Sequence, residues 1–395
     1  MRKLLFIAVL LPILAGLGWW YFREHALPDY GPAYREYAYV TNGKSNTVSV
    51  IDLRTFSLAK TIQVGSEPTG IATNSKKNEI YVVNTGSNNI TVIDAETNTV
   101  VATIGVHGRP YFIDVAEDGK RAYVANSGSS NVSVIDLEKR QVTGNVKVGA
   151  APGLARVSPD GSTVVVSNRG DNTVSLIDAA YLRVRATLPV CRQPEDIAIL
   201  PDSSKAFVSC SGSSQVASIG LKSDAGQGTD KKGDRVLALL DVGRTPVSLA
   251  LKPDGGELMV CDFDSDSISI IETGNDEVGS SQEIGQHPSR GVVTLDNSRL
   301  YVSNFGSNSV AVYDIDMGRR IATLTVGSRP DGLALTPDQN YLLVLDTQSG
   351  DVTVIQKRKP RKLEPTEYSL LTLIPVGMQP NAIVVKAFMV STKKQ

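Results

Sequence analysis

Residues 68–105 read PTGIATNSKKNEIYVVNTGSNNITVIDAETNTVVATIG, and this stretch predicts four short β-strands. Its apolar runs lie at residues 68–72, 80–84, 90–94 and 100–104. Between them stand segments rich in Asn, Ser, Lys and Thr, which are typical of tight turns. We name the four expected strands A to D in chain order.

The same pattern occurs eight times between Tyr39 and the C-terminus. The expected B strands begin at Tyr39, Tyr81, Tyr123, Val165, Phe207, Met259, Tyr301 and Leu343. Successive starts lie 42 residues apart, except for an interval of 52 between Phe207 and Met259. A period of 40 to 45 residues with four strands is typical of a propeller blade. The sequence therefore predicts an all-β propeller of eight four-stranded blades, with A as the inner strand.

The two ends of the repeat region predict how the ring closes. No A strand precedes Tyr39, and residues 380–385 form an A strand without a following B strand. Pairing these terminal strands would complete one blade and remove two sheet edges. Because the unit at Leu343 is the least regular, a ring of seven blades is the alternative.

Three motifs resemble the YVTN family of β-propellers: Tyr39-Val40-Thr41-Asn42, residues 48–52 (VSVID) and residues 64–70 (VGSEPTG). The resemblance extends over nearly everything after residue 38. It implies a bacterial or archaeal surface or periplasmic protein, related to lactonase-like propellers and to the haem-binding propeller of cytochrome-type nitrite reductases. A fold that hosts so many functions does not assign a reaction.

Residues 1–22 are different in kind and predict a membrane anchor. Arg2 and Lys3 precede an apolar run at residues 4–22 that ends in two Trp, a Tyr and a Phe. This run is long enough to cross a bilayer, and aromatic residues favour the membrane interface. We expect a single-pass transmembrane helix, a linker at residues 23–36 and an extracytoplasmic propeller at residues 37–395. The alternative is a cleaved signal peptide.

The anchor also predicts which face of the ring lies near the membrane. A chain that enters at the start of a B strand enters on the face of the A-B and C-D hairpins, the hairpin face. One inserted loop on this face carries five cations that would contact anionic lipid: Lys357, Arg358, Lys359, Arg361 and Lys362. The alternative is a solvated loop.

The opposite face, made of D-A corners and B-C turns, is the predicted ligand-binding rim. A proline recurs at every corner, whereas the residue before it varies from Glu67 to Arg109 to His287. Fixed positions build the blades, and variable positions are free to bind a ligand. The predicted rim residues are Arg109, Tyr111, Arg192, Arg244, His287, Arg290, Arg329 and Asp331.

The five arginines of this set would form a positive funnel at the channel mouth. Such a funnel suits a carboxylate, a phosphate or an acidic protein loop. The alternative is that the arginines pair with Glu67, Glu195 and Asp331 as surface salt bridges.

Two histidines at corners raise the question of haem. His107 and His287 enter units three and seven, which are opposite in a ring of eight. The resemblance to haem propellers implies that one of them could be an axial ligand. Against haem, the sequence has no Cys-x-x-Cys-His. We expect no cofactor, with haem as the alternative.

Signatures of catalysis and nucleic-acid binding are missing from the sequence. It has no His-Glu-x-x-His, no Gly-x-Ser-x-Gly and no zinc-spaced cysteines. Asp262, Asp264 and Asp266 alternate as in a calcium loop, but Ser267 and Thr273 replace the required Gly and Glu. A formal charge of −1 argues against nucleic-acid binding. No metal site and no catalytic residue is predicted.

Two of the three cysteines are placed to form a disulfide. Cys191 begins a corner and Cys210 ends the neighbouring B strand, so both approach the rim. In an oxidising compartment they could be joined, and the alternative is two buried thiols.

Together these features favour a membrane-anchored binding scaffold for a protein, a cell-surface polymer or an anionic ligand. A haem-binding or redox-accessory propeller and a lactonase-type hydrolase are the alternatives, and the sequence favours a protein that is not an enzyme.

Overall fold

A computed structural model describes residues 31–222, 233–358 and 367–390. The chain forms two compact units. The larger unit, residues 36–386, holds the propeller. The smaller unit combines residues near both ends of the chain, and in it the Val390 N–H donates to the Ala33 carbonyl at 2.9 Å.

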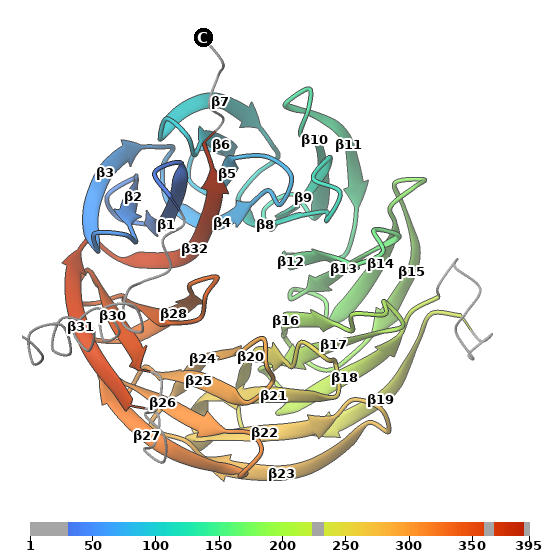
Figure 1. Ribbon diagram of the computed structural model, residues 1–395. Coiled ribbons are helices and arrows are strands. Elements are labelled where there is room, and N and C mark those ends of the chain that lie inside the picture. The colour runs from blue at the N-terminus through green and yellow to red at the C-terminus, as the bar shows by residue number, and fades with distance from the viewer. Residues whose placement is uncertain (1–30, 223–232, 359–366, 391–395) are drawn as a thin grey trace, which may run out of the picture. The chain divides into compact units, whose positions relative to one another are not determined.

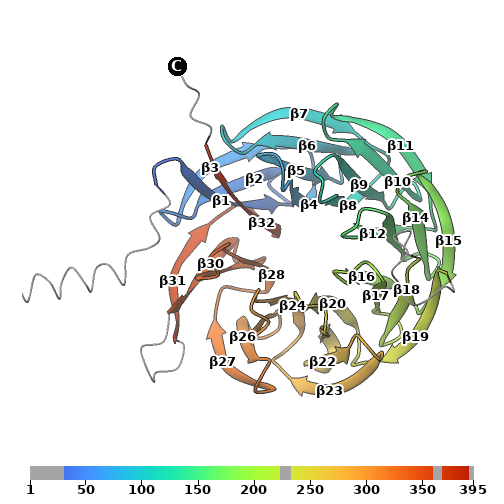
Figure 2. The same cartoon turned by 45° about the vertical axis from the view of Figure 1, so that its right-hand side comes forward.

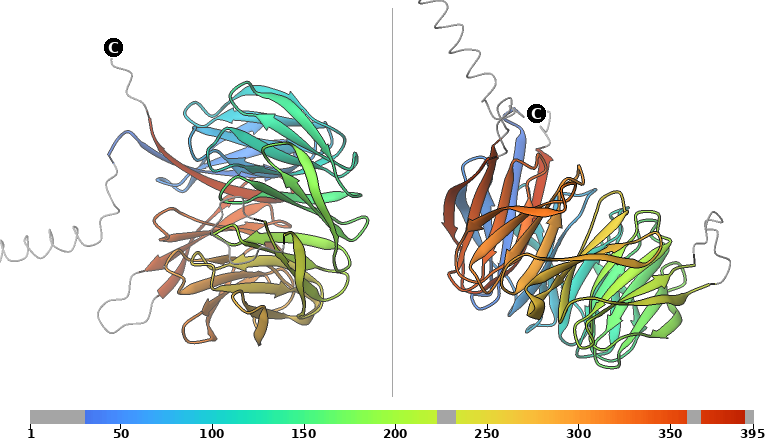
Figure 3. Two further views of the ribbon diagram at one scale, coloured as in Figure 1. Left: turned by 90° about the vertical axis from the view of Figure 1, so that its right-hand side faces the viewer. Right: turned by 90° about the horizontal axis from the view of Figure 1, so that it is seen from below.

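The larger unit consists of eight antiparallel four-stranded sheets arranged around a common axis (Figure 1). This confirms the prediction of eight blades and excludes the ring of seven. The inner strands surround the centre and the outer strands form the circumference (Figure 2). Seen from the side, the strands run between the two faces of the ring (Figure 3).

Each blade is a meander whose strands follow one another from the inside outward. The first four blades are β32 (Pro380–Met389), β1 (Tyr34–Asn42), β2 (Thr47–Asp52), β3 (Ser57–Gln63); β4 (Pro68–Thr73), β5 (Glu79–Asn84), β6 (Asn89–Asp94), β7 (Thr99–Gly105); β8 (Pro110–Val115), β9 (Arg121–Asn126), β10 (Asn131–Asp136), β11 (Gln141–Lys147); and β12 (Pro152–Val157), β13 (Thr163–Asn168), β14 (Thr173–Asp178), β15 (Arg183–Pro189).

Blades 5 to 8 have the same order. They are β16 (Pro194–Ile199), β17 (Lys205–Cys210), β18 (Gln215–Gly220), β19 (Arg235–Asp241); β20 (Pro246–Leu251), β21 (Glu257–Asp262), β22 (Ser267–Glu272), β23 (Glu277–Glu283); β24 (Pro288–Val293), β25 (Arg299–Asn304), β26 (Ser309–Asp314), β27 (Arg319–Thr325); and β28 (Pro330–Leu335), β29 (Tyr341–Asp346), β30 (Asp351–Arg358), β31 (Glu367–Pro375). A short 3-10 helix, Phe263–Ser265, lies in the B-C turn of blade 6.

Blade 1 closes the ring, because its inner strand β32 comes from the end of the propeller sequence and pairs with β1. The Gly43 N–H donates to the Gln379 carbonyl at 3.0 Å. The Gly377 N–H donates to Asn42 Oδ1 at 3.1 Å. The predicted closure by the terminal strands is confirmed, and neither β1 nor β32 is left as an unpaired inner edge.

The core lies between neighbouring blades. Tyr123 of β9 and Val132 of β10, for example, pack with Val164 and Val166 of β13 in the next blade. These strands are rich in β-branched residues, which pack well on pleated surfaces. Similar clusters follow around the ring, so each blade buries apolar side chains against its neighbours.

Two predictions fall on residues that the structure does not describe. The expected anchor at residues 1–22 lies outside the described residues. So do three of the cations of the predicted membrane-contact loop, at positions 359, 361 and 362. In the part of the chain that the structure describes, no helix has the length and apolar character needed to cross a membrane.

Candidate functional site

The D-A corners share one backbone conformation, which the sequence does not predict. The residue before each corner proline has a positive φ between 47° and 55°: Glu67, Arg109, Ala151, Gln193, Thr245, His287, Arg329 and Gln379. This left-handed conformation is unusual outside glycine. It lets the corner carbonyl accept from the next B-C turn, as Glu67 O does from Thr85 N at 3.0 Å.

Because of this conformation, the corner side chains lie along the rim beside the B-C turns. Arg109 lies beside Gly128, and Arg192 lies beside Gly212. Arg244 donates through Nε to the Asp264 carbonyl at 3.2 Å. None of these three arginines lines the central cavity. The described residues therefore do not form the predicted funnel of five converging arginines.

The other members of the predicted rim set do meet in the central channel. Tyr111, Arg290 and Asp331 line a cavity of about 610 Å³ between the inner strands. The charged residues of its lining are Asp114, Arg156, Glu195, Asp196, Arg290 and Asp331, so carboxylates outnumber cations four to two.

Arg290 is held between two of these carboxylates. Its Nε lies 3.7 Å from Asp331 Oδ1, and its Nη1 lies 3.9 Å from Asp196 Oδ2. Burial lowers the pKa of Arg290, but the charges of Asp331 and Asp196 outweigh this effect and raise it. Asp196 Oδ2 also accepts from the Leu249 N–H at 3.0 Å. Of the surface salt bridges given as the alternative, the structure shows the one between Arg290 and Asp331 and adds one between Arg290 and Asp196.

The described residues do not fit a haem held over the channel. In residues 31–222, 233–358 and 367–390, no histidine, cysteine or methionine lines the central cavity. His107 Nδ1 is instead hydrogen-bonded to the Asn131 side chain, and His287 stacks on Phe263 with ring centroids 4.7 Å apart. Neither His107 nor His287 is among the residues that line the central cavity.

Among the described residues, no group of three or more His, Cys, Asp or Glu side chains is arranged to hold a metal ion. Asp264 accepts from the Thr245 hydroxyl at 2.6 Å, and Asp266 accepts from the His287 N–H at 2.8 Å. The three alternating aspartates are parts of a polar B-C turn, and the two that bind corner groups stabilise the rim.

A second cavity, of about 740 Å³, lies on the rim where blades 7, 8 and 1 meet. We call it the rim groove. It is lined by Lys44, Ser45, Phe305, Arg329 and residues 347–350 and 376–379. Among the described residues that line it, Lys44 and Arg329 are charged and none is a carboxylate. The lining of the groove therefore carries a net positive charge, whereas the lining of the central cavity carries a net negative charge.

An aromatic strip of Phe263, His287 and Phe305 leads along the rim to this groove. The Phe263 and Phe305 ring centroids lie 6.1 Å apart, and the Arg329 guanidinium lies 5.4 Å from the Phe305 centroid. The repeat pattern predicted Arg329 and His287 as rim residues but did not indicate the two phenylalanines. The position after the last residue of strand B is Gly43, Thr85, Ser127, Arg169, Ser211, Phe263, Phe305 and Thr347 in the eight blades. Comparing this position among the repeats would have found them, because the scaffold does not require an aromatic residue there.

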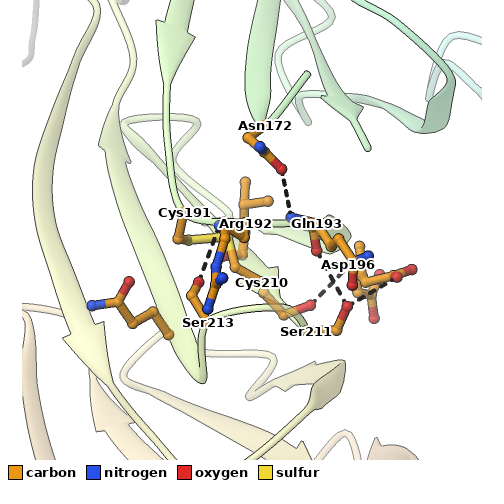
Figure 4. The surroundings of a disulfide bond; sticks show 12 residues. Asn172, Cys191, Arg192, Gln193, Asp196, Cys210, Ser211 and Ser213 are labelled. Carbon is orange, nitrogen blue, oxygen red and sulfur yellow. Dashed lines mark hydrogen bonds between the residues drawn. A yellow bond between two sulfur atoms is a disulfide. The ribbon is translucent and has the colours of Figure 1, made fainter. Parts of the chain in front are cut away.

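Cys191 and Cys210 form a disulfide, with their Cα atoms 5.6 Å apart, on the corner face of blade 5 (Figure 4). The adjacent corner is held by two side chains of B-C turns: Ser213 Oγ accepts from the Arg192 N–H at 3.0 Å, and Asn172 Oδ1 accepts from the Gln193 N–H at 2.9 Å. Cys261 is a buried free thiol.

On the hairpin face, two cations of the predicted membrane-contact loop are described. Lys357 and Arg358 end β30, and the Lys357 N–H donates to the Asn340 carbonyl at 2.8 Å. Contact of this loop with lipid stays a prediction.

Two family models match parts of the chain. The YNCE-like β-propeller model matches residues 18–157, and the model of the lactonase 7-bladed β-propeller matches residues 280–376. No curated protein matches the chain.

Several solved structures share the fold. Hydrazine synthase from Kuenenia stuttgartiensis is 22% identical over 70% of this chain and 91% of that chain, with a TM-score of 0.57. The dihydro-haem d1 dehydrogenase NirN, in complex with DHE, is 15% identical over 88% of this chain and 74% of that chain, with a TM-score of 0.72. A putative 6-phosphogluconolactonase from Bacteroides fragilis is 14% identical over 91% of this chain and 100% of that chain, with a TM-score of 0.60.

At these identities the likeness concerns the fold alone. It agrees with the two family models, which match the first blades and the last blades separately. The chain is thus a β-propeller repeat protein that is similar to the YNCE-like and the lactonase propeller families over these segments.

Proposed function

We propose that this propeller is a binding protein whose rim groove takes an organic anion, either free or displayed on a polymer or protein. The observation that carries the proposal is the composition of the groove. Lys44 and Arg329 provide positive charge, no carboxylate is among the described lining residues, and Phe305 and Met378 provide apolar surface. Cationic groups attract an anion, and an aromatic face adds contact with a planar or apolar part of the ligand.

The central channel supports this role less well. Its arginines already face carboxylates of the same chain, as Arg290 faces Asp196 and Asp331. An anion entering there would have to displace these partners and would meet four acidic residues. In the rim groove, an anion can contact Lys44 and Arg329 without displacing a carboxylate of the described lining.

The proposal is tested with benzoate, a small anion that has a planar apolar ring. Ligand-observed NMR on the full-length chain should detect binding to the wild type. The double variant Lys44→Ala/Arg329→Ala should weaken binding roughly tenfold or more, because each lost charge contact to an anion contributes on the order of 1 kcal/mol.

The control for this experiment is Arg109→Ala/Arg192→Ala, which removes two corner arginines that do not line the groove. Equal weakening in both double variants would point to a general charge effect and contradict the groove as the site.

We further propose that the propeller acts outside the cytoplasm, anchored by residues 1–22. The support is the apolar run behind Arg2 and Lys3 together with the Cys191–Cys210 disulfide, since disulfides persist in oxidising compartments. An alkaline phosphatase fused after Gln395 folds only outside the cytoplasm and should be active. Activity of a β-galactosidase fusion at the same position, with an inactive phosphatase fusion, would contradict this location.

A further inference from the structure

The B-C turns of the eight blades have one equivalent position, the fourth residue after the end of strand B. It is Asn46, Asn88, Ser130, Asn172, Ser214, Asp266, Asn308 and Gly350. All eight have positive φ, and the carbonyl of each accepts a backbone N–H from the segment after the blade's outer strand. Val64 N to Asn46 O, at 3.1 Å, and Val376 N to Gly350 O, at 2.9 Å, are two of these bonds. The backbone at Gly350 is therefore equivalent to that at the other seven turns.

Five of these residues use their side chains to hold the next corner. The Asn or Asp oxygen accepts from the N–H of the residue before the corner proline, which is Glu67, Arg109, Gln193, His287 or Arg329 in turn. The distances lie between 2.7 and 3.0 Å. A planar carboxamide or carboxylate is thus the group that fits this space.

Blade 8 lacks this group because Gly350 has no side chain. The equivalent corner N–H belongs to Gln379, and it has no hydrogen-bond partner among the described residues. Gly350 and Gln379 both line the rim groove, so the space that a side chain fills at five other corners is open in blade 8. The unpaired Gln379 N–H can therefore donate a hydrogen bond to an anion, and the nearby cationic groups of Lys44 and Arg329 favour a negatively charged acceptor.

We infer that the rim groove binds a carboxylate in the place of the side chain that Gly350 lacks. One carboxylate oxygen accepts from the Gln379 N–H, as Asp266 Oδ1 accepts from the His287 N–H at 2.8 Å. Lys44 and Arg329 neutralise the charge, and the organic part of the ligand contacts Phe305 and Met378. This inference rests on the proposed function and names the chemical group and its backbone anchor.

The test refills the site from within the chain. Asn occupies the equivalent position in four blades at φ between 51° and 60°, so Gly350→Asn is compatible with the backbone. Its side chain should bond to the Gln379 N–H and exclude the ligand. We expect Gly350→Asn to weaken benzoate binding roughly tenfold or more, as the loss of a hydrogen bond to a charged group does.

Ser214→Asn is the matched control, because it introduces the same residue, Asn, at the equivalent position of a turn outside the groove. It should leave benzoate binding unchanged. In the wild type, benzoate should also shift the backbone amide resonance of Gln379, whereas benzamide, which has the same shape but no charge, should bind at least tenfold more weakly.

The outcomes separate the inference from the proposed function. If Gly350→Asn binds benzoate as the wild type does, while Lys44→Ala/Arg329→Ala does not, the groove stands and the carboxylate anchor is wrong. If benzoate fails to shift the Gln379 amide, the anchor is also wrong, even if Gly350→Asn does not fold. If benzoate does not bind the wild type, both proposals fail.

Discussion

Replacing two buried aspartates by asparagine, Asp262→Asn and Asp346→Asn, is expected to stabilise the propeller strongly at neutral pH. These residues end the B strands β21 and β29, and both have a relative exposure of 0%. Burial raises the pKa of Asp262 from 3.8 to about 6. A pKa difference of about two corresponds to on the order of 3 kcal/mol that ionised Asp262 costs the folded state.

Asp346 adds to this effect. Burial raises its pKa, and the neighbouring carboxylate of Asp351 raises it further because two like charges share one site. The Thr353 hydroxyl donates to Asp346 Oδ2 at 2.6 Å, but Asp346 Oδ1 has no partner among the described residues. Removing the charge at position 346 therefore removes both the cost of desolvating a buried carboxylate and its repulsion from Asp351.

The repeats show what asparagine does in this position. Asn168 ends the equivalent strand in blade 4, and its amide donates to Thr173 and Ser175, each at 2.9 Å. Blade 6 offers Ser267 and Ser269 at the same places. An asparagine there gains two acceptors and carries no charge that must be desolvated.

The gain should depend on pH in a defined direction. Below pH 3.8, Asp262 is protonated in the folded and the unfolded chain and costs nothing. Between pH 3.8 and about 6 the unfolded chain loses this proton first, so wild-type stability falls as the pH rises. The pKa of Asp346 is raised to about 8, so this residue extends the fall in wild-type stability to higher pH. The difference between the double variant and the wild type should therefore be small near pH 4, large at pH 7 and largest above about pH 8.

Urea unfolding at pH 4, 5.5 and 7 measures this difference. Asp316→Asn, on an exposed turn, is the control for removing one negative charge and should change the midpoint little. If the double variant is less stable than the wild type at pH 7, or if its unfolding midpoint is shifted equally at all three pH values, the two ionised carboxyl groups do not destabilise the folded state.

The sequence predicted the ring because a repeated unit averages out local errors. One blade, read from Pro68 to Ile104, specifies the meander, and eight copies specify the circle. The closure followed from the absence of an A strand before Tyr39 and the extra one after Pro380, which the pairing of β32 with β1 confirms.

The rim was harder to predict because it depends on backbone conformation. A residue before proline usually favours extended conformations, whereas Arg109 and Arg329 are left-handed. The Arg109 side chain lies beside Gly128, and the Arg329 side chain lies over the Phe305 ring, both in B-C turns. The predicted rim residues therefore divide between the channel, which contains Arg290 and Asp331, and the rim groove, which contains Arg329. Position in the repeat gave the face of the ring but not the direction of the side chain.

The same comparison of repeats explains the disulfide. The position of Cys191 is Gly65, Gly149, Gly243, Gly285, Gly327 and Gly377 in six other blades and His107 in blade 3. In all six, the glycine packs directly against the Asn or Asp that ends the B strand; a Cβ on Gly65 would lie 2.7 Å from the Asn84 side chain. In blade 5, the Cys191–Cys210 disulfide replaces this packing contact between the corner and the end of strand B.

Reducing this bond is the second change with a large expected effect. It closes a loop with a sequence separation of 19, for which the chain-entropy model gives about 3 kcal/mol. Wild-type chain unfolded in urea with a reductant should lose about this much free energy of unfolding relative to the oxidised chain. Thiol counting before unfolding checks that the bond is broken.

Two variants separate the bond from the packing around it. Cys191→Gly/Cys210→Asn restores the pair that the other blades use, and an asparagine at position 210 would meet Gln215 as Asn84 meets Asn89 at 2.8 Å. Cys191→Ser/Cys210→Ser instead places two short hydroxyls in this buried contact. Neither variant should respond to reductant, and the Gly/Asn variant should be the more stable of the two because its amide has an acceptor. If reduced wild type unfolds at the same urea concentration as oxidised wild type, the disulfide does not stabilise blade 5; if the Ser/Ser variant matches the Gly/Asn variant, the repeat pair is not what packs this corner.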